Sequence, residues 1–79
     1  MQNELFNRIT INPEVMVGKP TIRGVRITVE QILKALAAGL TTKDLLEDYP
    51  ELEEEDIKAA LLYASELVGE EKVFAVSTR

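Results

Sequence analysis

Residues 18–33 read GKPTIRGVRITVEQIL, and this stretch decides how the chain folds. Its first eleven residues hold two glycines, a proline and three cations, and its last residues carry the signals of a helix start. The proline at position 20 disfavours helical angles at the residue before it, so the backbone leading to Thr21 is expected to be extended. We therefore expect two short extended pieces, centred on Ile22 and Arg26, to pass directly into a helix.

The residues after this stretch predict a helix with signals at both ends. Thr28 and Gln31 have the spacing of a capping box, in which each side chain binds the backbone amide of the other residue. Gly39 supplies the left-handed residue that commonly ends a helix, and Leu40 is placed to fold back on the last turn. Apolar residues recur between these ends at helical spacing: Val29, Ile32, Leu33, Leu36 and Ala37.

Two further helices are expected in the second half of the chain. Thr41 or Thr42 can cap the first of them, and Pro50 ends it. The next helix is expected to open in the acidic run 53–56, whose charges suit the positive end of the helix dipole, and to end at Gly69. Its expected inner face consists of Ile57, Ala60, Leu61, Ala64 and either Leu67 or Val68.

The outer segments of the chain complete this plan. Polar and apolar residues alternate over 8–11, which predicts a short strand, and residues 72–76 suggest either a closing strand or a loose tail. The β segments are too short to form a sheet alone, so they pack on the helices or pair with a second chain. The fold class is therefore mainly α: a three-helix, helix-turn-helix bundle preceded by short β segments.

The length of 79 residues predicts a single domain, 1–79, near the lower limit for a self-sufficient core. Within it, residues 8–27 form the β segments and basic loop, residues 28–69 the bundle, and residues 70–79 the strand or tail. A homodimer would bury more apolar surface than one small chain can, so we expect one. No apolar run is long enough for a membrane span and no signal peptide is visible, which predicts a cytoplasmic chain without a membrane partner.

The composition argues against catalysis. The sequence has no cysteine and no histidine, so neither Ser65 nor Ser77 has a histidine base. Gly18-Lys19 does not match a phosphate-binding loop, because positions 13 and 20 are both proline. The carboxylates of residues 53–56 point in different directions on a helix, which fits a solvated helix start better than a metal site. We expect no enzyme activity, no cofactor and no metal.

Charge is distributed unevenly, and this suggests where a partner binds. Residues 1–34 carry five cations against three acids, whereas residues 35–79 carry four cations against eleven acids. A third helix that begins with four acids is unsuited to the major groove of DNA, because phosphates repel it. A basic edge is the alternative DNA-binding site, and its candidate residues are Arg8, Lys19, Thr21, Arg23 and Arg26. The competing interpretation is that Arg23 and Arg26 pair with acids of the chain itself or of an interface.

The chain resembles domain-of-unknown-function family 433, small bacterial and archaeal proteins with a homeodomain-like helix-turn-helix core. The resemblance covers residues 8–66 in order and spacing. It departs at Val25 and Glu53, where the family usually has threonine and a threonine or serine helix cap. The residues that carry it are Ile11-Asn12-Pro13, Gly18 to Gly24, Arg26-Ile27, Val29, Ile32-Leu33, Ala38-Gly39-Leu40, Leu45-Leu46, Asp48-Tyr49-Pro50, Leu52, Asp56-Ile57, Ala59-Ala60-Leu61 and Tyr63-Ala64.

The resemblance implies an antitoxin-like protein that binds a cognate PIN-like nuclease toxin and regulates its own operon by binding DNA. The acidic second half would suit the basic surface of such a nuclease. Val73, Phe74 and Val76 are candidate partner-binding residues, because short apolar segments near chain ends often order on a partner, although they could equally close the chain's own core. The alternative function is a non-catalytic adaptor without any nucleic-acid role.

Overall fold

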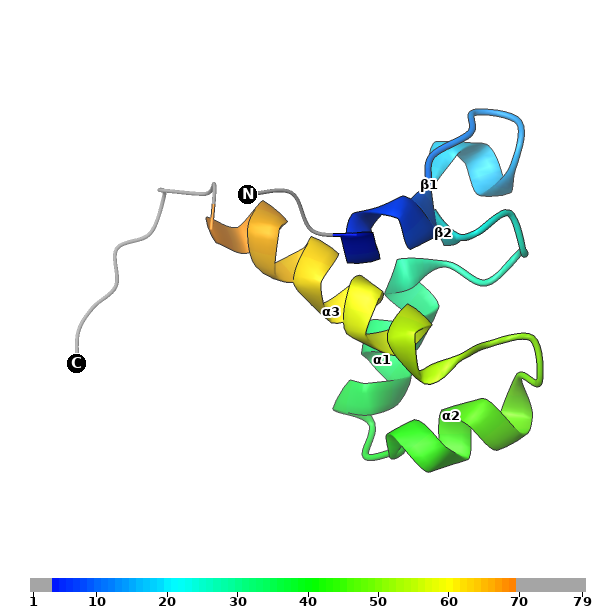
Figure 1. Cartoon of the computed structure of the whole chain (residues 1–79), viewed down its shortest axis with the longest axis vertical. Coiled ribbons are helices and arrows are strands. Elements are labelled where there is room, and N and C mark those ends of the chain that lie inside the picture. Colours follow the sequence, from blue (N-terminus) through cyan, green and yellow to red (C-terminus); the bar gives the residue numbers. More distant parts are fainter. Residues whose placement is uncertain (1–3, 70–79) are drawn as a thin grey trace.

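The computed structural model describes residues 4–69, which form a bundle of three α-helices with a small sheet at one side (Figure 1). The long helix α3 packs against both α1 and α2, and the first 3-10 helix, η1, lies along α3. In chain order the elements are η1 (Glu4–Arg8), β1 (Ile9–Thr10), η2 (Met16–Gly18), β2 (Thr21–Ile22), α1 (Val29–Ala37), α2 (Thr42–Asp48) and α3 (Glu54–Gly69).

The predicted β segments form a two-stranded antiparallel sheet in which Ile9 pairs with Ile22. After β2 the chain reverses in a tight turn, closed by the Val25 N–H donating to the Ile22 carbonyl at 2.7 Å. The two central residues of this turn, Arg23 and Gly24, have φ values of 40° and 83°. Two successive positive φ values are typical of a type I′ turn. The second expected extended piece, centred on Arg26, is therefore mostly part of this turn and its exit.

Helix α1 has the ends that its sequence predicts. The Gln31 N–H donates to Thr28 Oγ1 at 3.0 Å and the Thr28 N–H donates to Gln31 Oε1 at 2.8 Å, which completes the capping box. At the other end Gly39 has a φ of 104°, and the Leu40 N–H donates back to the Ala35 carbonyl at 3.1 Å. This pattern is a Schellman motif, and it confirms the predicted helix end.

The second helix, α2, is capped by Thr41, the first of the two expected candidates. Asp44 returns its carboxylate to the Thr41 N–H at 2.9 Å, and α2 ends at Asp48, two residues before Pro50. The third helix begins at Glu54 as expected, and Ile57 and Ala60 of its predicted inner face are buried, but Leu61 is not. Leu61 is 47% exposed, because the residues turned inward are Asp56, Ile57, Ala59 and Ala60. Leu67 and Val68 are also at least half exposed.

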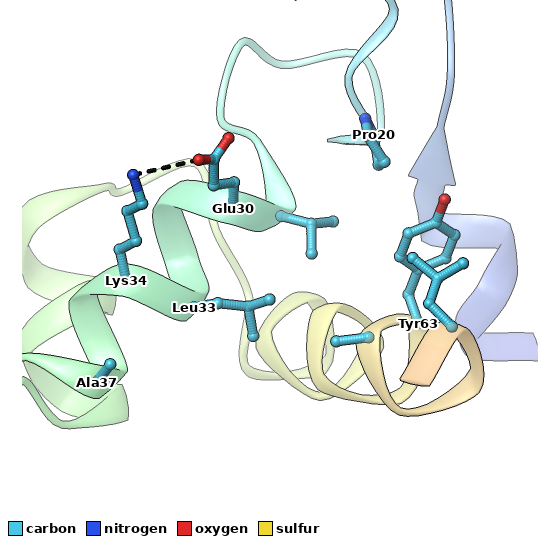
Figure 2. Close-up of a pocket in the computed structure, with 9 residues that line it drawn as sticks. Pro20, Glu30, Leu33, Lys34, Ala37 and Tyr63 are labelled. Carbon is cyan, nitrogen blue, oxygen red and sulfur yellow. Dashed lines mark ion pairs between the residues drawn. The ribbon is translucent and has the colours of Figure 1, made fainter. Parts of the chain in front are cut away.

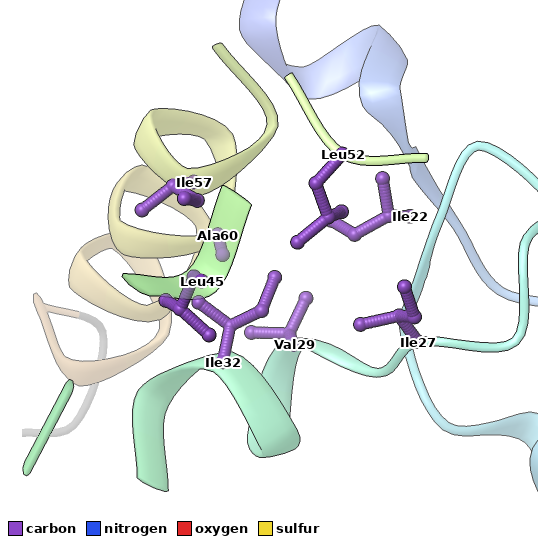
Figure 3. Close-up of a cluster of buried hydrophobic side chains, with 8 residues drawn as sticks. All are labelled: Ile22, Ile27, Val29, Ile32, Leu45, Leu52, Ile57 and Ala60. Atoms are coloured by element: carbon purple, nitrogen blue, oxygen red, sulfur yellow. The ribbon is translucent and has the colours of Figure 1, made fainter. Parts of the chain in front are cut away.

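The core joins the sheet to the helices (Figure 3). It combines side chains of β2 and the turn with those of the three helices, so the β segments pack on the bundle of their own chain. No helix within residues 4–69 is long and apolar enough to cross a membrane. The predicted C-terminal strand or tail, 70–79, lies outside the described residues. The buried cluster consists of Ile22, Ile27, Val29, Ile32, Leu45, Leu52, Ile57 and Ala60.

Replacing Gly39 by alanine tests the α1 end. A Cβ at Gly39 would meet no atom within 4 Å, so any cost comes from the φ of 104°, which L-residues rarely adopt. We expect Gly39→Ala to lower the free energy of unfolding by about 1–2 kcal/mol, measured by urea unfolding. Gly69→Ala is the matched control, because Gly69 also has open space but is helical. It is expected to be neutral or slightly stabilising, and equal losses for both variants would contradict the conformational explanation.

Candidate functional site

A buried carboxylate lies at the start of α3. Asp56 is 0% exposed, and each of its oxygens accepts two hydrogen bonds. Oδ1 accepts from Arg8 Nη1 and from Arg23 Nε, both at 2.9 Å. Oδ2 accepts from Arg23 Nη2 at 2.7 Å and from the Glu53 N–H at 2.8 Å. We call Asp56, Arg8 and Arg23 the Asp56 cluster.

The backbone of the sheet brings the two arginines together. Arg8 ends η1 just before β1 and Arg23 follows β2, and the Arg23 N–H donates to the Arg8 carbonyl at 2.8 Å. Arg23 Nη2 also donates to the Glu51 carbonyl at 2.8 Å, and Arg8 Nη1 contacts Glu53 Oε1 at 2.8 Å. We call residues 4–24, from η1 to the turn after β2, the N-terminal arm. The Asp56 cluster therefore joins this arm to the start of α3 and to the link before it.

The surroundings of Asp56 change its acidity strongly. Burial alone would raise the pKa of this carboxyl group, because it disfavours the charged form. The hydrogen bonds from Arg23, from the Glu53 backbone and from Arg8 outweigh burial and lower the pKa from 3.8 to about 2. The same contacts raise the pKa values of both arginines. All three groups are thus charged at neutral pH.

The structure separates the residues predicted to form a DNA-binding edge. Arg8 and Arg23 belong to the Asp56 cluster, so the internal ion-pair interpretation holds for Arg23. Thr21 is fully buried and its hydroxyl donates to the Thr10 carbonyl at 3.2 Å, so the expectation of a DNA-facing Thr21 is wrong for this conformation. Lys19 is exposed and pairs with Glu30 at 2.8 Å. Arg26 is exposed and makes no ion pair within residues 4–69.

Asp56 itself was missed by the sequence interpretation, which placed it in a solvated acidic run. Its neighbours Glu53, Glu54 and Glu55 are indeed exposed, but Asp56 is not. One signal could have identified it: Asp56 shares a helical face with Ala59, Ala60 and Tyr63, at spacings of three, four and seven residues. Within the described part of the chain, no group of three or more acidic side chains is arranged to hold a metal ion.

Two surfaces remain available for partners. Exposed carboxylates cover the end of α2 and the start of α3, and we call them the acidic face: Glu47, Asp48, Glu51, Glu53, Glu54 and Glu55. The other surface is an apolar groove of about 430 Å³ between α1 and α3 (Figure 2). Leu33 of α1 and Tyr63 of α3 lie on opposite sides of it, with Pro20 at one end. The predicted partner-binding residues Val73, Phe74 and Val76 lie outside the described residues.

Replacing Asp56 by asparagine tests the cluster. The amide keeps the size of the side chain but removes its charge, which leaves two arginines without their shared anion. Because both arginines can regain some water, we expect the free energy of unfolding to fall by roughly 2–3 kcal/mol. Glu53→Gln is the control, because it removes only a surface ion pair and is expected to cost less than about 1 kcal/mol. A loss for Asp56→Asn no larger than that of Glu53→Gln would contradict the assignment.

The lowered pKa of Asp56 also predicts how stability depends on pH. Since the folded pKa is about 2 and the ordinary value is 3.8, the stabilisation is present above pH 4 and is lost as pH falls toward 2. We expect the native protein to lose about 2 kcal/mol more than Asp56→Asn over this interval. Urea unfolding of both proteins between pH 2 and 5 measures the difference, and parallel curves would refute it.

Comparison with known proteins places this fold in a family. The sequence pattern of the family described as "Protein of unknown function (DUF433)" matches residues 9–64. A crystal structure of a DUF433 member from Anabaena variabilis superposes with a TM-score of 0.76 at 36% identity, covering 81% of this chain and 63% of that one. The uncharacterized protein y4eO of Sinorhizobium fredii is 35% identical over 68 residues, which is 84% of this chain. This chain matches only 31% of the length of that protein. The match over most of the bundle, together with the shared structure, shows that the chain belongs to the DUF433 family.

Proposed function

We propose that this chain is a non-catalytic, antitoxin-like protein that binds and neutralises a PIN-like nuclease. The observation that supports this function most is the acidic face. Residues 43–58 contain eight acids and only two lysines, and the six carboxylates of the acidic face, at the end of α2, in the link after it and at the start of α3, are all exposed. Glu53 alone among the six forms an ion pair within residues 4–69, with Arg8. The others are free to meet positive charge on a partner.

A nuclease offers the matching surface. An enzyme that binds RNA has to present basic groups to the phosphate backbone. An acidic protein face can occupy those groups, steer the encounter and exclude the substrate. The start of α3 is suited to this role for the same reason that it is unsuited to the major groove of DNA.

Regulation of the operon forms a second part of the proposal. Arg8 and Arg23 are held by Asp56, so we assign any contact with DNA to Lys19 and Arg26. Both side chains are exposed, and Arg26 has no ion-pair partner within the described residues. Contacts to phosphates through these two residues would position the protein on DNA without specifying a sequence.

Purification of the tagged chain from its native cell tests the first part. We expect a stoichiometric nuclease to accompany it and to regain activity when the chain is removed. Glu54→Lys should weaken this complex at least about tenfold at low salt, because it places a cation in the acidic face. Glu14→Lys makes the same charge change at an exposed site in the loop between β1 and η2 and should weaken the complex no more than about twofold. Recovery of the chain alone, or equal effects of both variants, would refute the assignment.

A gel-shift assay with the operon's own upstream DNA tests the second part. Lys19→Ala with Arg26→Ala should abolish retention and leave the melting temperature nearly unchanged, because neither side chain is buried. Retention should also fall steeply as salt is raised. If the native protein is not retained at low salt, the DNA-binding part is wrong. An adaptor without any nucleic-acid role would then be supported if the purification also yields a partner that is not a nuclease.

A further inference from the structure

Tyr63 and Leu67 lie one helical turn apart on α3, between two apolar hollows of the surface. Both residues line each of these hollows. One hollow is the α1–α3 groove of Figure 2. The other, of about 360 Å³, lies toward η1 and β1 and is lined by Phe6, Ile9 and Ile11. Because Leu67 is half exposed between the two, we call this pair the Tyr63–Leu67 ridge.

The charges beside the ridge and beside the groove are opposite in sign. The α1 rim of the groove carries Lys34 and Glu30. Glu30 pairs with Lys34 and also with Lys19, which does not line the groove itself, so the two lysines together outnumber the one acid here. Glu66 lies next to the ridge and lines the other hollow. The surface thus combines an apolar projection beside a negative charge with an apolar groove beside a positive charge.

We propose that this surface binds a second copy of the chain in a twofold dimer, with the ridge of each copy in the α1–α3 groove of the other. A twofold interface uses the same patch on both subunits, so the patch has to complement itself. Here the exposed Leu67 and Glu66 of one copy can meet the apolar groove and Lys34 of the other. In this arrangement Glu66 of each copy faces Lys34 of the other copy.

The net charge of the chain favours the same surface. Two copies that each carry a charge of −5 repel one another over most of their area. Next to the groove, where Lys19 and Lys34 both pair with Glu30, a second copy can approach closely. No residue of the acidic face lines either hollow, so this dimer is independent of the proposed nuclease contact.

Sedimentation velocity over the micromolar range tests the dimer with a matched pair of variants. Leu67 and Leu61 lie on the same helix and are 50% and 47% exposed, but only Leu67 lines the hollows. We expect Leu67→Arg to be monomeric and Leu61→Arg to dimerise like the native protein, with helical circular dichroism unchanged in both. A native protein that is monomeric throughout, or one whose dimer survives Leu67→Arg, would overturn the proposal.

A charge exchange tests the orientation of the two copies. Lys34→Glu and Glu66→Lys should each weaken the dimer about tenfold or more, because each contact occurs twice. The double variant should return to within about threefold of the native dissociation constant. Lys34 also pairs with Glu30 at 3.2 Å within its own chain, and the double variant does not restore that pair. Restoration therefore supports the contact between copies, and its absence overturns this arrangement. Lys58→Glu, with the same charge change as Lys34→Glu, is expected to have little effect.

Discussion

One buried negative charge sets the relation between the N-terminal arm and the helical bundle. Asp56 is removed from water at the start of α3, which costs free energy unless its lone pairs are satisfied. Two arginines and a backbone N–H satisfy them at 2.7–2.9 Å. The two arginines come from neighbouring positions at the ends of the paired strands. The turn holds the backbone of Arg23 at a φ of 40°, which residues other than glycine rarely adopt. The contact of Arg23 with Asp56 in the bundle thus helps to maintain an unfavourable backbone angle in the arm.

The parts of the fold that depend on local sequence were predictable. The capping boxes of α1 and α2 and the Schellman end at Gly39 require residues within six positions of one another. The side of α3 that faces the core was not predictable in full, because it depends on the contact of Asp56 with arginines far away in the sequence. An acidic run at a helix start has the same local signal whether its last member is solvated or buried. The expectation that Leu61 faces inward therefore failed while the start of α3 was placed correctly.

Of the candidate surfaces, too, some could be predicted from the sequence and others could not. The concentration of acids in the second half was visible in the sequence, and six of these acids are exposed at the end of α2 and the start of α3. The basic edge was not realised as a continuous surface, because acids contributed by α3 and its preceding residue hold two of its arginines. The apolar groove was hidden from sequence analysis, since Pro20, Leu33 and Tyr63 come from three separate segments. The packing of α1 against α3 brings Leu33 and Tyr63 together, and the Val29 N–H, which donates to the Pro20 carbonyl at 3.0 Å, holds Pro20 beside α1.

The wide sequence separations within the Asp56 cluster have a consequence for the order of folding. The contacts of Asp56 with Arg23 and Arg8 span 33 and 48 residues, whereas the helix caps close loops of a few residues. Closing long loops costs more entropy and slows contact formation, so the individual helices are expected to form before the arm docks. Interactions that form after the transition state control how fast a protein unfolds and have little influence on how fast it folds. The Asp56 cluster would then slow unfolding and lengthen the lifetime of the native state without changing the folding rate much.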